Sequence, residues 1–189
     1  MANDINSGSY AQYEGFDSIS YDCIKYLMDN DELIWKLLAY STPDAWNKAN
    51  LSQEEKAALI YTGQDDASLF KVFMDDGNPD AFTQEGCLIR IHPYTLNPDN
   101  RVWGSVTVMF SVFSNFHANH LSNYKTRNHV IVQRFIQVFN GINVPHADNP
   151  NTSIGKLHFD AMGTFGLRMD SQGQLPWRGS WVLMGQKSN

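Results

Sequence analysis

Two apolar segments, residues 87–94 and 102–113, constrain the fold of this chain more than any other feature. Both segments are rich in β-branched and aromatic residues, and a run of turn formers, Asn-Pro-Asp-Asn at 97–100, separates them. This arrangement predicts a β-hairpin. In the second segment, apolar residues occupy both sets of alternating positions, so we expect an interior strand with a helix on one face and a further apolar partner on the other.

The first third of the chain has the periodicity of helices. Residues 18–29 repeat apolar side chains at helical spacing, and a second helix is expected after Asn30, which can serve as its N-cap. A third helix is expected over 52–63, because Ser52 and Glu55 have the spacing of a capping box. The N-terminal part of the chain should therefore be a group of short helices.

Strand-like alternation returns at residues 69–74, and two further strands are expected over 156–169 and 181–186. Between them, residues 126–139 have near-helical recurrence that ends at a glycine, and this segment should pack on the sheet. The fold class expected is α+β: N-terminal helices, then a four- to five-stranded, mainly antiparallel sheet with one helix packed on it.

The chain is long enough for one domain with a proper core. Within that single domain we expect a flexible N-terminus at 1–16, a helical N-terminal region at 17–65 and an α+β region at 66–189. The apolar runs are all shorter than a membrane span, which agrees with a protein that has no membrane partner.

Charge is distributed unevenly along the sequence. Residues 1–100 hold 6 basic and 17 acidic residues, whereas residues 101–189 hold 8 basic and 3 acidic residues. A molecule of this kind is suited to head-to-tail contact between copies, or to a surface that faces a polyanion. Charges scattered without one coherent patch would give the same counts, and this alternative stays open.

Searches for chemical motifs find no site. Cys23 and Cys87 lie far apart, so we expect two buried thiols rather than a disulfide or a zinc site. Three histidines at 117, 120 and 129 lie close together, but no acidic residue occurs between 101 and 145, which favours loop histidines over metal ligands. The sequence has no phosphate-binding glycine loop and no nucleophile elbow. We therefore expect no catalytic residues, no cofactor and no metal.

The order of acidic helices, hairpin, helix and closing strands resembles the layout of the tail-terminator and tail-completion proteins of tailed bacteriophages. The resemblance covers about residues 85–186 and is carried by the segments 87–113, 126–140, 156–169 and 181–186. It implies a non-enzymatic virion protein that assembles in the host cytoplasm into a ring, commonly a hexamer, and caps the tail tube at the neck.

The same resemblance implies the partners: other copies of the chain, the tail tube protein, the head-tail connector proteins and, transiently and without sequence preference, the genomic DNA. The helical extension before residue 65 departs from this layout and leaves open a head-tail adaptor or head-completion protein. A small-ligand-binding α+β domain, or an enzyme whose residues are scattered in sequence, is the alternative of another class.

Two sets of residues are candidates for contacts in such a ring. The first set combines dispersed basic side chains with nearby loop histidines and would face the lumen: Lys125, Arg127, Arg134, His117 and His120. The second set lies near the C-terminus, in a chain whose aromatic content of 13% is high for its number of interior positions, and would form a subunit interface: Trp177, Arg178 and Trp181. An ordinary solvated loop and simple core packing are the respective alternatives.

Overall fold

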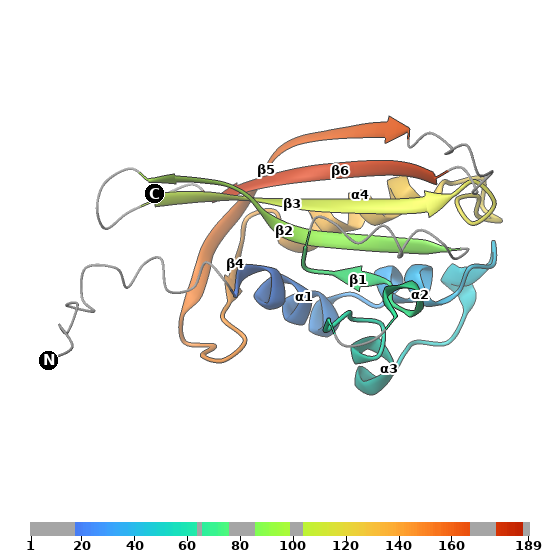
Figure 1. The fold of residues 1–189 in the computed structure, drawn as a ribbon, viewed down its shortest axis with the longest axis horizontal. Helices are drawn as coiled ribbons and strands as arrows, with labels where there is room; N and C mark the ends of the chain where they lie inside the picture. The colour runs from blue at the N-terminus through green and yellow to red at the C-terminus, as the bar shows by residue number, and fades with distance from the viewer. Residues whose placement is uncertain (1–17, 64–65, 76–85, 99–103, 167–176, 187–189) are drawn as a thin grey trace, which may run out of the picture.

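The computed structural model describes residues 18–63, 66–75, 86–98, 104–166 and 177–186. These residues form a strongly curled six-stranded sheet with helices against one of its faces (Figure 1). The strands are β1 (Val72–Phe73), β2 (Cys87–Pro98), β3 (Gly104–Asn115), β4 (Ile142–Pro145), β5 (Ser153–Gly166) and β6 (Trp177–Gln186).

The strand order is β1-β2-β3-β6-β5-β4. All neighbouring pairs are antiparallel except β1 and β2, so the sheet is mixed. The α+β prediction is therefore confirmed at the level of class, whereas the expected strand number of four to five is wrong. The strand that was not predicted is β4, which has only four residues.

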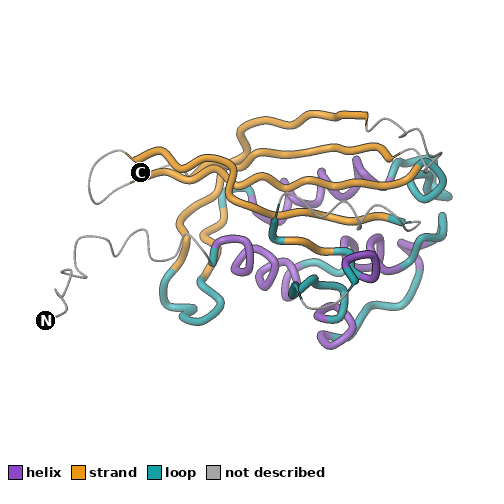
Figure 2. Tube along the Cα trace, in the orientation of Figure 1, coloured by secondary structure: helices purple, strands orange, loops and turns teal. Residues whose placement is uncertain are grey.

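Four α-helices accompany the sheet in the described part of the chain: α1 (Ile19–Asn30), α2 (Leu33–Ala39), α3 (Gln53–Ala57) and α4 (Arg127–Phe139). Helix α4 packs against β3 and β6, and α1 packs against β2 and β4. In Figures 1 and 2, α4 lies behind the sheet, and α1 to α3 lie along its lower edge.

The predicted hairpin is confirmed. Strands β2 and β3 pair antiparallel, with Ile89 opposite Val112 and Ile91 opposite Phe110. Strand β3 also pairs with β6, so it is the interior strand that its two apolar faces predicted. The predicted helix over 126–139 is confirmed as α4.

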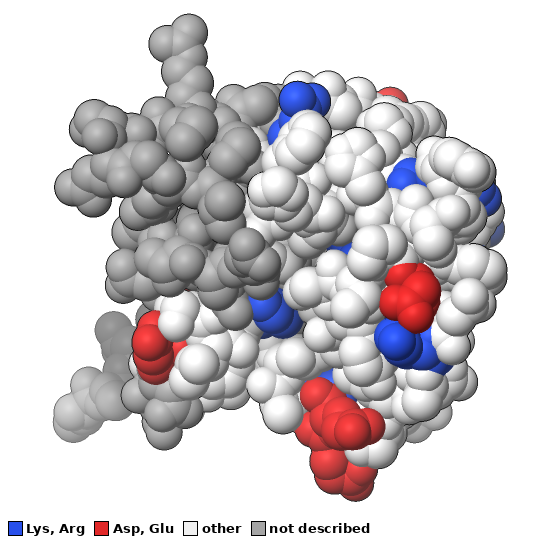
Figure 3. All heavy atoms as spheres, turned by 90° about the vertical axis from the view of Figure 1, so that its right-hand side faces the viewer, with Lys and Arg blue, Asp and Glu red and all other residues white. Residues whose placement is uncertain are grey.

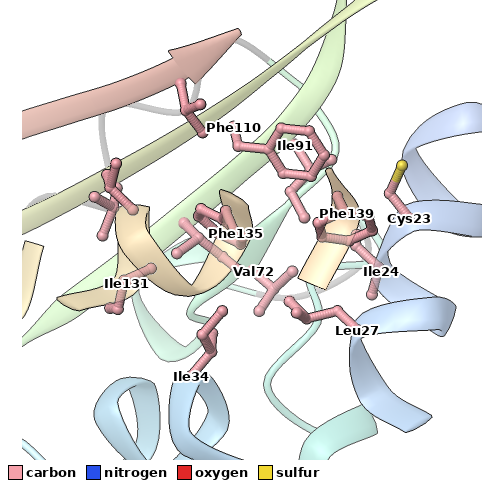
Figure 4. Close-up of a cluster of buried hydrophobic side chains, with 14 of the residues drawn as sticks. Cys23, Ile24, Leu27, Ile34, Val72, Ile91, Phe110, Ile131, Phe135 and Phe139 are labelled. Carbon is pink, nitrogen blue, oxygen red and sulfur yellow. The ribbon is translucent and has the colours of Figure 1, made fainter. Parts of the chain in front are cut away.

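One large core joins the helices to the inner face of the sheet. Phe110 of β3 lies between two aromatic residues of α4, with ring centroids 5.1 Å from Phe135 and 4.8 Å from Phe139. Ile24 and Leu27 of α1 enter the same cluster (Figure 4). Burial of these apolar surfaces supplies most of the stabilisation of the fold.

The opposite face of the sheet has its own smaller cluster. Phe113 of β3 and Leu88 of β2 pack there with Phe73 and Trp177, and none of the buried residues in this cluster comes from α1 to α4. Apolar residues on both faces of β3 are thus explained by two separate clusters. The further apolar partner expected on the second face of β3 is this smaller cluster of side chains from the same chain.

The N-terminal helices differ in detail from the prediction. The capping box is confirmed, because Ser52 Oγ accepts from the Glu55 N–H at 3.2 Å and Glu55 Oε2 accepts from the Ser52 N–H at 2.7 Å. The helix nevertheless ends at Ala57 rather than near residue 63. Ile60 forms a parallel bridge with Val72, which takes the chain out of the helix and onto the sheet edge.

A close approach between β5 and β6 gives a first prediction. The indole of Trp181 lies against Gly163, and a Cβ built on Gly163 would stand 2.6 Å from Trp181 Cζ2. We expect Gly163→Ala to lower the free energy of unfolding by about 1–3 kcal/mol, because the indole must move out of its packing. Chemical denaturation followed by tryptophan fluorescence measures the change.

Gly185 in β6 is the matched control, because a Cβ there would have Thr107 Oγ1 as its nearest neighbour at 3.8 Å. Gly185→Ala should leave stability unchanged or raise it slightly. Equal losses in the two variants would show that contact with Trp181 does not limit position 163.

Candidate functional site

Three of the candidate lumen and interface residues meet at one end of the molecule, around the ring of Phe116. This ring follows β3, contacts His117 and His120 edge-on at centroid distances of 5.9 and 5.1 Å, and is itself exposed. The guanidinium of Arg178, from the start of β6, lies 5.8 Å from the same ring. Three of the eight predicted residues thus form one exposed cation-aromatic group.

Lys125 is exposed at the same end of the molecule, two residues before α4. Figure 3 shows this end, and its basic side chains are dispersed rather than gathered into one cluster. Arg134 lies farther along α4, where its Nε donates to Asp31 Oδ2 at 2.7 Å and its Nη1 donates to Gln137 Oε1 at 2.8 Å. An internal ion pair therefore neutralises the charge of Arg134.

The prediction that Arg127 faces a lumen is wrong. Its side chain has no exposed surface and donates to the backbone carbonyls of four residues: Leu37, Ala118 at 2.6 Å, Tyr40 at 2.8 Å and Thr42 at 3.0 Å. Two of these acceptors lie at the C-terminal end of α2, where carbonyls lack helical partners and carry partial negative charge. Burial lowers the pKa of Arg127 from its usual range, although the guanidinium remains charged at neutral pH. Arg127 fixes the start of α4 to the end of α2.

The C-terminal tryptophans are mainly structural. Trp177 is 5% exposed and belongs to the apolar cluster on the outer face, so its prediction as an interface residue is wrong and the core-packing alternative holds. Trp181 is half-buried against Gly163. Arg178 is the member of this set that is exposed.

A polar pocket of about 340 Å³ opens between the N-terminus of α4 and the adjoining ends of β5 and β6. Its lining is made mostly of amides, hydroxyls and one guanidinium: Asn119, Thr126, Asn128, Thr164, Arg178 and Ser180. His129 also lines the pocket, and none of the lining residues in the described segments is acidic. Sequence reasoning missed this site because its residues come from three segments that only the fold brings together.

Hydrogen bonds fix the floor of the pocket. The backbone oxygen of Asn119 accepts from the Arg127 N–H at 2.7 Å, and Asn119 Oδ1 accepts from the Asn128 N–H at 3.1 Å. Asn128 Nδ2 donates to the backbone oxygen of Arg178 at 2.9 Å, which ties α4 to β6. Two polar atoms are buried here without a partner in the structure, Asn128 Oδ1 and Thr126 Oγ1.

Neither metal nor membrane chemistry finds support in the described segments. They contain no group of three or more histidine, cysteine or acidic side chains placed to hold a metal ion. Within the same segments, the helices are too short or too polar to cross a membrane.

Both cysteines are buried and free, as predicted. Burial raises the pKa of Cys87 to about 12, and burial together with the Asp22 carboxylate raises that of Cys23 further. We therefore expect neither thiol to react with an aromatic disulfide reagent in the native protein at mildly alkaline pH, because the thiolate is the reactive form. Both should react once a denaturant is added. Rapid labelling of either thiol in the native protein would contradict its placement in the core.

Together these features define an α+β protein with a mixed six-stranded sheet, helices on its inner face and a polar pocket at the start of α4. The chain belongs to the YomW family, whose model matches residues 31–169, from the residue that caps α2 to beyond the end of β5. YomW is a phage-associated family name. No curated protein matches the chain.

Proposed function

We propose that the protein is a structural component of a tailed-phage particle, which forms a ring at the head-tail neck and terminates the tail tube. Membership of a family with a phage-associated name supports the phage origin. The layout of hairpin, helix and closing strands that resembles tail terminators is present as β2, β3, α4, β5 and β6. A head-tail adaptor or head-completion protein is the nearest alternative.

The observation that best supports the ring proposal is the incomplete strand pairing at the two edges of the sheet. Strand β1 covers β2 only at Ile89 and Arg90, and β4 covers only the first part of β5. In the described part of the chain, residues 93–98 of β2 and 161–166 of β5 therefore pair on one side only. These segments lie on opposite edges of the sheet, and joining one edge to the opposite edge of the next copy is a head-to-tail contact that can close into a ring.

Apolar side chains accompany both edges. Tyr94 is 54% exposed and Leu96 is exposed on β2, while Met162 is 51% exposed and Phe159 is exposed on β5. Monomeric proteins protect open edges with charges, prolines or bulges, because such edges pair readily with other chains. Pro93 and a bulge at Pro93/Thr95 interrupt the edge of β2, and a bulge at Phe159/Ala161 precedes the open segment of β5. The segment 161–166 of β5, with exposed Met162, is therefore the part of the two edges that best suits contact with another copy.

The test is the mass of the purified protein in solution, followed by electron microscopy of the same sample. We expect a closed ring, and we expect Met162→Lys to shift the mass toward the monomer, since it places a charge on the edge of β5. Tyr124→Lys, at an exposed aromatic residue in the loop before α4, is the control and should leave the ring intact. A monomer at high concentration and low salt would contradict self-assembly.

The end of the molecule that carries Lys125, His117 and His120 is proposed to face the path of the DNA. A lumen that lets DNA pass should carry dispersed rather than dense positive charge, because a dense cluster would retain phosphate groups by counterion release. Lys125→Glu tests this in assembled particles. Retarded or incomplete DNA delivery supports the assignment, and normal infectivity contradicts it.

The polar pocket favours a second candidate function, a small-ligand-binding domain. Polar groups from three segments of the chain converge on this pocket, which is typical of binding sites. Thr164 belongs both to the lining of the pocket and to the open segment 161–166 of β5, so the pocket adjoins one of the edges proposed for contact between copies.

A further inference from the structure

The N-terminus of α4 has an unusual cap. Thr126 occupies the N-cap position with extended backbone angles, φ −97° and ψ 135°, but its hydroxyl makes no capping hydrogen bond. Thr126 Oγ1 is instead buried without a partner, in a residue that lines the pocket. Asn119 caps the first turn instead, because its backbone oxygen and Oδ1 accept from the N–H groups of Arg127 and Asn128, so the Thr126 hydroxyl is available to a group in the pocket.

Asn128 supplies the second, independent observation. Its side chain is 3% exposed and lines the same pocket. Because Asn128 Nδ2 donates to the Arg178 backbone oxygen, the orientation of the amide is fixed, and the atom without a partner is the acceptor Oδ1. A buried acceptor of this kind is normally satisfied by a donor, and a ligand that donates a hydrogen bond would supply one.

The other residues that line the pocket favour a negatively charged ligand. The guanidinium of Arg178 attracts an anion, and the hydroxyls of Thr164 and Ser180 are further donors. Among the described residues that line the pocket, none carries a carboxylate to oppose an anion. The ligand must therefore combine several acceptor oxygens with at least one hydrogen-bond donor.

We propose that this pocket binds a hydrogen phosphate group, either inorganic phosphate or the terminal phosphate of a phosphomonoester in its singly protonated form. A hydrogen phosphate has one O–H for Asn128 Oδ1, and its other oxygens can accept from Thr126 and Arg178. Sulfate and simple carboxylates have no such O–H at neutral pH. The volume of about 340 Å³ leaves room for an organic group attached to the phosphate.

Titration calorimetry of the full chain, in a phosphate-free buffer at about pH 6, tests the proposal with inorganic phosphate as the probe. At this pH about half of a phosphomonoester keeps its O–H, whereas sulfate has none. We expect saturable binding of phosphate and at least about tenfold weaker binding of sulfate, because sulfate leaves the Asn128 acceptor unsatisfied. A 5′-phosphorylated dinucleotide and its dephosphorylated form distinguish the source. Binding of the phosphorylated form alone assigns a phosphomonoester, and binding of inorganic phosphate alone assigns the free ion.

The decisive variant is Thr126→Val, which removes a hydroxyl that has no partner in the free protein. It should weaken phosphate binding at least about tenfold while leaving the melting temperature unchanged or higher, a result that a purely structural hydroxyl would not give. Arg178→Met should also weaken binding, and Lys125→Met, outside the pocket lining, should not. Absence of saturable phosphate binding, equal affinity for sulfate, or unchanged affinity in Thr126→Val would each overturn the proposal.

Discussion

Replacing Arg127 with methionine is expected to lower the free energy of unfolding by at least about 3 kcal/mol. Methionine fills much of the space of the arginine stem but offers no donors, so it leaves the carbonyls of Leu37, Tyr40 and Ala118 without the partner that they have in the native protein. A buried acceptor without a partner costs about 1–3 kcal/mol. The loss should appear as a lower midpoint of urea denaturation.

Lys125→Met is the matched control, since it removes an exposed cation two residues earlier in the chain. Its effect should stay within about 0.5 kcal/mol. Arg127→Lys should be intermediate, because one ammonium group cannot reach all the acceptors that the planar fork reaches. Equal midpoints for Arg127→Met and Lys125→Met would contradict the role assigned to the buried guanidinium.

Asp31→Ala should give the second large loss, about 2–3 kcal/mol. The Asp31 carboxylate is fully buried, and it accepts from the Ile34 N–H at 2.7 Å, which caps α2. It also accepts from two nitrogens of Arg134 on α4. The variant removes the cap and leaves a partly buried arginine without its ion-pair partner.

Asp29→Ala is the comparison for this loss. Asp29 is exposed near the end of α1, where its carboxylate accepts from Gln53 Nε2 at 3.3 Å. Its replacement should change stability by less than about 0.5 kcal/mol, and Asp31→Asn should fall between the two. Differential scanning calorimetry of the three variants measures the order, and equal melting temperatures would contradict the account of Asp31.

Strands and helices with a clear periodic pattern of apolar residues within their own sequence could be predicted. The hairpin of β2 and β3 and the helix α4 were predicted because alternation and helical recurrence are local properties, and the capping box at Ser52 is likewise local. Strand β4 was not, because its four residues include a proline and become a strand only by pairing with β5. The end of α3 was misplaced for a similar reason, since the bridge from Ile60 to Val72 overrides helical propensity.

The candidate site shows the limit of sequence reasoning more sharply. Arg127 follows Lys125 in a polar segment and was predicted to be exposed, but its partners are backbone carbonyls of residues 37–42 and 118, which no side-chain pattern reveals. The pocket behind it was missed because Asn119, Thr164 and Ser180 meet only in the folded chain.

The structure pairs some of the charges from the acidic half of the sequence with charges from its basic half. Asp31 from the acidic half pairs with Arg134 from the basic half inside one molecule. Some of the opposite charges are therefore used within the fold, and the proposed contacts between copies rest on the edges of β2 and β5 rather than on charge.

The most direct test of the proposed function is electron microscopy of phage particles assembled without this protein. A tail terminator sets the end of the tail tube and provides the surface that joins it to the head. We therefore expect tails of uncontrolled length that are not attached to DNA-filled heads, and restoration of normal particles by the wild-type chain but not by Met162→Lys. Tails of normal length, joined to heads and infectious in the absence of the protein, would contradict the account.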